Sequence, residues 1–120
     1  MTERDRIVVV DDHLELAETL AEILSLDGFD VRTASDGQSA LAVIAEHTPI
    51  CVLTDVDMPK LNGFELAKRL RERYGQDMVL IAITGWGDSN DRFLPSFGVF
   101  DHCLRKPIKL DAVRKILRPG

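Results

Sequence analysis

Acidic side chains in this 120-residue sequence gather where apolar runs stop. Two follow the run at 7–10, and two more follow the run at 50–53, within the stretch VLTDVDMPKLNG. A lone buried carboxylate is unfavourable unless it is paired or bound to a metal. These acids therefore either lie in solvent at a loop or hold a cation. They are Asp11, Asp12, Asp55 and Asp57.

Hydrophobic periodicity predicts the elements that position these acids. Short apolar or β-branched runs alternate with segments whose apolar residues recur at helical spacing. Strands are predicted at 7–10, 31–34, 50–54, 78–83 and 100–104, and helices at 14–26, 38–46, 62–74, 88–97 and 110–117. This alternation predicts an α/β fold with a doubly wound parallel sheet and helices on both faces. The second and fifth strands are the least apolar, so burial favours the order 2-1-3-4-5, with those two at the edges.

In a parallel sheet the carboxyl ends of all strands share one edge, where ligands bind. The four acids follow the first and third strands, and a hydroxyl and an ammonium follow the fourth and fifth, on Thr84 and Lys106. Taken singly, each is more often a turn residue or a solvated side chain. Together, the like charges call for a hard divalent cation such as Mg²⁺, which prefers oxygen ligands. The set is suited to phosphoryl transfer, with an acid as nucleophile.

The composition limits the classes of function. The chain is 45% hydrophobic and 29% charged with a net charge of −5, which is typical of a soluble domain and argues against direct nucleic-acid binding. It has neither an apolar run near ~18 residues nor a signal peptide, so we expect no membrane association. Cys51 and Cys103 lie in apolar segments, as expected for reduced core thiols of a cytoplasmic protein. We expect one domain over 1–120, with no output domain in this chain.

Four stretches carry a family resemblance: VVVDD (8–12), LTDVDMPKLNGFEL (53–66), AITG (82–85) and LRKP (104–107). In this order and spacing they resemble the receiver domain of two-component response regulators. The segment TGWGDSNDR…FDHCLRKP further resembles receivers attached to hybrid sensor histidine kinases. The resemblance implies a flavodoxin-like (βα)5 three-layer sandwich that acts in a phosphorelay.

The resemblance also implies a role for each residue at the sheet edge. Asp55 would accept a phosphoryl group from a histidine kinase or a histidine phosphotransfer protein. Asp12 and Asp55 would ligate Mg²⁺ directly, Asp11 would act through water, and Asp57 would contribute its backbone carbonyl. Thr84 would hydrogen-bond the phosphoryl group, and Lys106 would pair with it. Pro107 would follow a cis peptide bond, which X-Pro bonds adopt at low cost.

Three positions depart from the family pattern. Cys103 stands where the family often has an aromatic residue that swings inward during switching. Val99 stands where a glycine usually ends the fourth helix. Pro95 falls inside the predicted fourth helix, so we expect that helix to be short, kinked or displaced.

The remaining predictions concern surfaces. Trp86 should flank the phosphoryl site and slow autodephosphorylation. Phe93 and Phe97 either fill space beside a shortened helix or form an exposed patch for kinase binding or a phosphorylation-dependent homodimer. We expect His13 at the surface where a helix starts, with a place lining the acidic site as the alternative, and His47 at the surface at a helix end.

Two other functions fit parts of the sequence. The pair Asp55 and Asp57 resembles the paired aspartates of haloacid-dehalogenase-type phosphatases, although there the pair opens the domain. A degenerate receiver, acting only as an unphosphorylated interaction module, is the second alternative. Turnover of a generic phosphate ester and phosphorylation by a small-molecule donor distinguish these possibilities.

Overall fold

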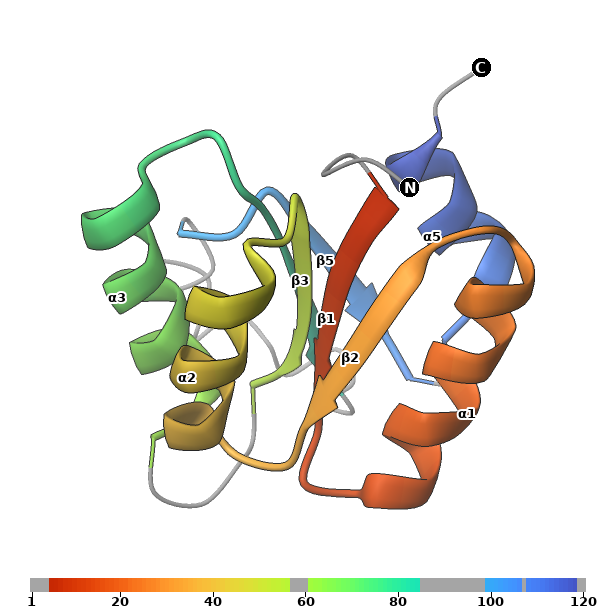
Figure 1. The fold of residues 1–120 in the computed structure, drawn as a ribbon, viewed down its shortest axis with the longest axis horizontal. Coiled ribbons are helices and arrows are strands. Elements are labelled where there is room, and N and C mark those ends of the chain that lie inside the picture. Colours follow the sequence, from red (N-terminus) through yellow and green to blue (C-terminus); the bar gives the residue numbers. More distant parts are fainter. Residues whose placement is uncertain (1–4, 57–60, 85–98, 107, 119–120) are drawn as a thin grey trace.

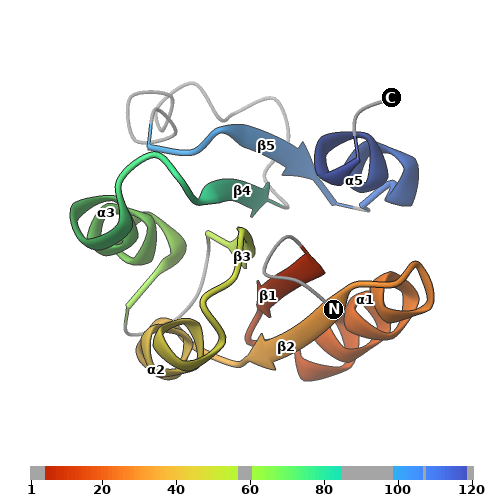
Figure 2. The same cartoon turned by 45° about the horizontal axis from the view of Figure 1, so that its top comes forward.

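The structure, a computed structural model, describes residues 5–56, 61–84, 99–106 and 108–118. Five parallel strands form one sheet in the order β2-β1-β3-β4-β5, as the sequence predicts. The strands are β1 (Arg6–Val10), β2 (Asp30–Ala34), β3 (Cys51–Asp55), β4 (Val79–Thr84) and β5 (His102–Arg105). Their succession across the sheet can be followed in Figures 1 and 2.

Four helices accompany the sheet in the described part of the chain: α1 (Leu14–Leu26), α2 (Gly37–His47), α3 (Gly63–Tyr74) and α5 (Leu110–Leu117). The bounds of α1 and α5 are the predicted ones. The predicted fourth helix at 88–97, with Pro95, lies outside the described residues. None of the described helices is both long and apolar enough to cross a membrane.

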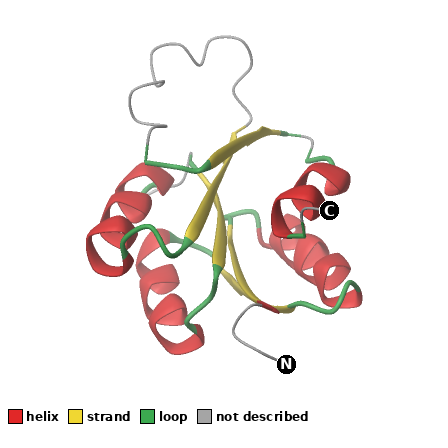
Figure 3. Ribbon diagram, turned by 90° about the horizontal axis from the view of Figure 1, so that it is seen from above, coloured by secondary structure: helices red, strands yellow, loops and turns green. Residues whose placement is uncertain are grey.

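The helices form two layers on opposite faces of the sheet. Figure 3 shows α2 and α3 on one face and α1 and α5 on the other. Two groups of buried side chains follow this division. One contains side chains from α2 and α3, and the other contains side chains from α1 and α5. Successive side chains of each central strand point to opposite faces and so belong alternately to the two groups. The result is the predicted three-layer sandwich.

The burial of the strands matches their predicted positions. Every residue of β3 is buried, as are all but the first of β1 and β4. The edge strands β2 and β5 are mostly exposed or half-buried. The strand β5 begins two residues later than predicted, at His102. Phe100, which precedes it, packs into the core on the α3 side beside Phe64.

Side-chain caps fix where two of the helices begin. The Asn62 carboxamide oxygen accepts a hydrogen bond from the Glu65 amide at 3.0 Å, and Asp36 accepts one from the Ser39 amide at 2.8 Å. The cap by Asn62 confirms the predicted start of α3. That helix ends before Gly75, whose φ of 69° lies in the left-handed region that glycine tolerates.

The expectation of a surface position for His47 is wrong. This side chain is 3% exposed. Its Nε2 lies 2.8 Å from the carbonyl oxygen of Asp30, to which it donates, so the ring at the end of α2 turns inward and ties α2 to the start of β2. The pattern of apolar and polar residues in the sequence cannot predict the burial of His47, because its hydrogen-bond partner is a backbone carbonyl 17 residues away.

Candidate functional site

The carboxyl end of β1 delivers Asp11 to the edge of the sheet. Its backbone amide donates to the Ala34 carbonyl at 3.1 Å, which continues the β1–β2 pairing. Its Oδ1 accepts a hydrogen bond from the His13 amide at 2.9 Å, just before α1 begins. The side chain is thereby held in a buried position, at 4% exposure, while neighbouring Asp12 is exposed.

Asp55 ends β3, the central strand, and is also 4% exposed. The amide that follows it, on Val56, donates to the Ile83 carbonyl at 3.1 Å and fixes the direction of the chain as it leaves the sheet. A Cβ atom at Gly63 would lie 2.5 Å from the Asp55 carbonyl oxygen. The first turn of α3 can therefore pack directly on the backbone of Asp55 only because residue 63 has no side chain.

Three carboxylates converge at this edge. One oxygen from each of Asp11, Asp12 and Asp55 lies within 4.8 Å of the others. Groups of like charge at this separation repel one another, and two of them are shielded from water. A cluster of oxygen donors with surplus negative charge is suited to a hard divalent cation, with Mg²⁺ taking few carboxylates and keeping several waters.

Lys106 supplies a positive charge to the same cluster. Its Nζ lies 3.3 Å from Asp55 Oδ2 and 3.7 Å from Asp11 Oδ2. The backbone amide of Lys106 donates to the Thr84 carbonyl at 2.8 Å, so the lysine is anchored to the end of β4. Thr84 itself is 2% exposed. Asp11, Asp12 and Asp55 thus converge with Lys106 at this edge, and Thr84 ends the strand that anchors the lysine.

Comparison with known proteins assigns this arrangement to a family. A family model described as "Response regulator receiver domain" matches residues 7–118. This chain belongs to the response regulator receiver family.

The similar proteins carry receiver sequences in larger chains. The receiver is 38% identical over 117 residues to a protein named transcriptional regulatory protein CpxR homolog, from Haemophilus influenzae. That match covers 94% of this chain and 50% of the relative. It is 36% identical over 113 residues to sensor histidine kinase RcsC from Salmonella typhi, covering 92% of this chain and 12% of the kinase. The chain therefore spans about half or less of these relatives.

Solved structures show the same fold. The response regulator TrrA from Thermotoga maritima, in complex with Mg²⁺ and BeF, superimposes with a TM-score of 0.83 at 29% identity, covering 94% of this chain and 96% of that one. The chemotaxis protein CheY4 from Vibrio cholerae gives a TM-score of 0.82 at 25% identity, covering 93% and 94%. The family match and these superpositions together give the fold of this chain as that of a receiver.

Several predicted site residues lie outside the described part of the receiver. They are Asp57, Trp86, Phe93, Phe97 and Pro107. Their predicted roles stay predictions.

Cys103 is described, and the expectation that both cysteines are core thiols is wrong for it. Cys51 in β3 is buried and Cys103 is exposed. The edge position of β5 explains the difference, since a strand with one neighbour leaves part of its surface uncovered.

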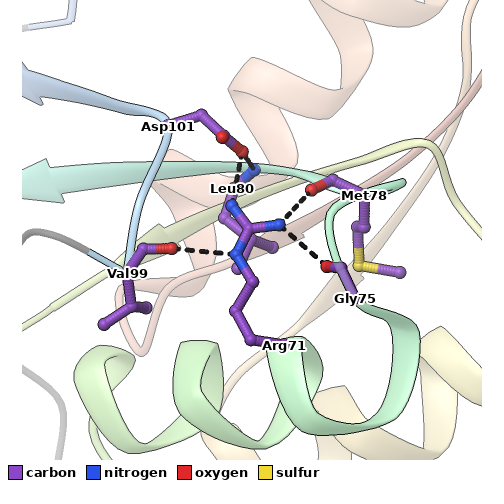
Figure 4. A network of polar contacts seen from close by, with 6 residues as sticks. All are labelled: Arg71, Gly75, Met78, Leu80, Val99 and Asp101. Carbon is purple, nitrogen blue, oxygen red and sulfur yellow. Dashed lines mark hydrogen bonds and ion pairs between the residues drawn. The ribbon is translucent and has the colours of Figure 1, made fainter.

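One polar network in the receiver has no signal in the sequence (Figure 4). The Arg71 guanidinium donates from Nη2 to Asp101 Oδ2 at 2.6 Å and from Nε to the Val99 carbonyl at 3.1 Å. Its Nη1 reaches the carbonyls of Met78 and Gly75 at 2.7 and 3.0 Å. The network fixes the end of α3 to the start of β4 and to the chain entering β5.

Asp101 completes the network from the other side. Its carboxylate accepts the Leu80 amide at 2.8 Å, and its own amide donates to the Leu80 carbonyl at 2.8 Å. Partial burial would raise the pKa of this carboxyl, but the Leu80 hydrogen bond and the Arg71 guanidinium together lower the pKa below its ordinary value. The sequence does not reveal this pair, because Arg71 and Asp101 are 30 positions apart.

Proposed function

We propose that Asp55 is the residue on which this receiver accepts a phosphoryl group. One observation carries the proposal: a carboxylate buried at the end of the central strand has a lysine ammonium 3.3 Å from its Oδ2 and two further carboxylates close by. Asp11 Oδ2 lies 3.7 Å from the same ammonium, the Nζ of Lys106, and Asp12 is exposed. Asp55 is the acid in this group that the central strand itself presents, facing the shared edge of the sheet.

The proposed donor is a phosphohistidine on a histidine kinase or a histidine phosphotransfer protein. A carboxylate oxygen of Asp55 attacks phosphorus, and an O–P bond forms as the N–P bond breaks. The electron pair of the broken bond stays on the imidazole nitrogen, and the ring, which carries one proton, leaves as neutral histidine. Lys106 orients the Asp55 carboxylate and offsets the charge that the phosphoryl oxygens bring. Water then hydrolyses the acyl phosphate and returns the receiver to its starting state.

The residues at this edge fit a magnesium site. Asp12 and Asp55 would ligate the ion directly, with Asp11 acting through water and the Asp57 carbonyl as a further ligand. When bound, Mg²⁺ neutralises negative charge on the carboxylates and the phosphoryl oxygens. The fit is supported by the three clustered carboxylates and by the complex of TrrA with Mg²⁺ and BeF.

The proposed output is a conformational change that controls a partner. A phosphoryl group adds about −1.5 to −2 charge beside Lys106 and Thr84, and the Lys106 amide is bonded to the end of β4. A change at Asp55 can therefore reach β4 and β5 together. We expect the partner to be a kinase or an effector domain in the cytoplasm, where free thiols such as Cys103 stay reduced.

The experiment uses a small-molecule phosphodonor, such as acetyl phosphate, with Mg²⁺. The wild-type receiver should become labelled, and Asp55→Asn should keep its fold and stay unlabelled. Asp111→Asn, on an exposed carboxylate of α5, is the matched control and should label like wild type. Mg²⁺-dependent label on Asp55→Asn would refute the assignment. No label on the wild type from either a donor or a kinase would favour the degenerate receiver.

A further inference from the structure

The first residue of α2, Gly37, packs directly on the backbone of Leu61, which lies two residues before α3. A Cβ atom at Gly37 would be 2.3 Å from the Leu61 carbonyl oxygen and 2.8 Å from Leu61 Cβ. Non-bonded carbon atoms in proteins pack at about 3.5–4.0 Å, so no side chain fits between these two residues. Residue 37 must therefore be glycine for α2 and Leu61 to pack as they do.

The backbone conformation of Gly37 does not account for the glycine. Its φ is not positive, in contrast to those of Gly28 and Gly75. Alanine is a better helix former than glycine, so helix propensity alone would favour alanine at this position. The contact with Leu61, rather than the geometry of α2, therefore explains the residue type.

Both sides of this contact are fixed by their surroundings. The Asp36 side chain caps α2 through the Ser39 amide at 2.8 Å, and Ile44 on the same helix is fully buried. Leu61 is 8% exposed and belongs to the same buried group as Ile44. The atom that faces Gly37 is a backbone oxygen, which cannot rotate away as the end of a flexible side chain can.

A second glycine contact joins Leu61 to the proposed phosphoacceptor. Gly63 begins α3, and a Cβ atom there would be 2.5 Å from the Asp55 carbonyl oxygen and 2.7 Å from Val56 Cα. The Gly63 amide donates to the Val56 carbonyl at 3.4 Å. Between the two contacts, Asn62 caps α3. A displacement of Leu61 therefore displaces the start of α3, which lies against the backbone of Asp55.

We propose that Gly37 is a positioning residue for the Asp55 site. By leaving room for the Leu61 carbonyl, Gly37 lets α2 hold the start of α3, and the start of α3 in turn holds Asp55 through Gly63. Gly37 acts only through these contacts and does not touch the reacting groups. The inference rests on the proposed function, because phosphoryl transfer to Asp55 is the reaction that Gly37 supports.

The test compares Gly37→Ala with the wild type in two measurements. Calorimetry without a phosphodonor gives the dissociation constant for Mg²⁺, and rates of phosphorylation by acetyl phosphate are measured at saturating Mg²⁺. The dissociation constant should rise roughly tenfold, as for other changes to residues behind metal ligands. The rate at saturating Mg²⁺ should fall roughly tenfold, because a misplaced nucleophile reacts slowly even when the ion is bound. Values for Gly37→Ala that match the wild type in both measurements would overturn the proposal.

Gly75→Ala is the matched control for lost stability. It is the same substitution at the other end of α3, where a Cβ atom would meet nothing within 4 Å. The φ of 69° at Gly75 disfavours alanine, so this variant should be destabilised while its site stays intact. Its Mg²⁺ affinity and phosphorylation rate should equal those of the wild type. If Gly75→Ala loses both as far as Gly37→Ala does, destabilisation alone explains the loss and the proposal is wrong.

Leu61→Ala tests the contact from its other side and decides the matter if circular dichroism shows Gly37→Ala to be unfolded. It removes the packing that holds Leu61 on α2, so it should also weaken Mg²⁺ binding, and unchanged binding in the folded variant would refute the proposal. A wild type that binds Mg²⁺ but is never phosphorylated on Asp55 refutes the proposed function alone, and the Mg²⁺ affinities of the variants still decide the role of Gly37. A wild type that binds no Mg²⁺ refutes both.

Discussion

Lys106 lies 51 residues after Asp55 in the sequence, yet its Nζ is 3.3 Å from Asp55 Oδ2. Asp55 ends β3 and Lys106 follows β5, and these strands are not neighbours, since β4 lies between them. The ammonium reaches across the end of β4, to which the Lys106 amide is bonded through the Thr84 carbonyl. The contact therefore depends on three strands at once, and a shift at the end of any of them changes the charge around Asp55.

Mg²⁺ should stabilise the receiver by relieving repulsion among the clustered carboxylates. A ligand at about 100 times its dissociation constant adds about 2.7 kcal/mol to the free energy of unfolding. Asp12→Asn should raise that free energy by roughly 1 kcal/mol without Mg²⁺, because one of three like charges is removed, and should lose most of the Mg²⁺-dependent gain. Urea unfolding with and without Mg²⁺ measures both effects. Equal Mg²⁺ gains in wild type and Asp12→Asn would argue against the site.

Arg71→Ala should lower the free energy of unfolding by about 2–4 kcal/mol. The substitution leaves three backbone carbonyls and the Asp101 carboxylate without their guanidinium donor. Arg71→Lys should recover little, because an ammonium cannot reproduce the planar fork. Arg69→Ala, on an exposed side chain of the same helix, is the control and should change stability little. A loss below about 0.5 kcal/mol for Arg71→Ala would show that the network is dispensable.

At low pH the protein should lose the stability that the ionised Asp101 carboxylate contributes. The pKa of its carboxyl in the folded protein lies below the ordinary value of 3.8. Its contribution to stability is therefore complete above that value and is lost as the pH falls through the lower, folded-state pKa. Below 3.8 the wild type should lose stability more steeply with falling pH than Asp101→Asn. Unfolding midpoints measured from neutral pH downward test this, and parallel curves for the two proteins would contradict it.

The two cysteines should react very differently with a thiol reagent. Burial raises the pKa of the Cys51 thiol well above its ordinary value, and the side chain is inaccessible. Desolvation also raises the pKa of Cys103, but this thiol is exposed and can be reached. The native receiver should thus label at Cys103, and Cys51 should react only on unfolding. A Cys103→Ser variant that labels rapidly while folded would show that β3 opens, contrary to its complete burial.

The sequence was sufficient to predict the strand order and the site edge. Three clear apolar runs, with the two weak runs at 31–34 and 100–104 placed at the edges, lead to the observed order. The acids at 11, 12 and 55 follow strands whose carboxyl ends must meet in any parallel sheet. Their proximity therefore follows from topology alone, before any side-chain position is known.

Other features depend on contacts that cannot be predicted from the sequence. His47 is buried by a hydrogen bond to a backbone carbonyl, and Arg71 and Asp101 pair across 30 positions. The requirement for glycine at position 63 comes from the Asp55 carbonyl, which only the folded chain brings within 2.5 Å of a Cβ atom there.

The chemical location of the phosphoryl group tests the central proposal most directly. An aspartyl phosphate can be trapped by borohydride, which reduces the acyl phosphate to an alcohol and converts that aspartate to homoserine. Tandem mass spectrometry of the receiver, phosphorylated with Mg²⁺ and then reduced, should find homoserine at position 55 and unmodified aspartate at positions 11, 12 and 57. Homoserine at Asp12 or Asp57, with Asp55 intact in a phosphorylated sample, would contradict the account.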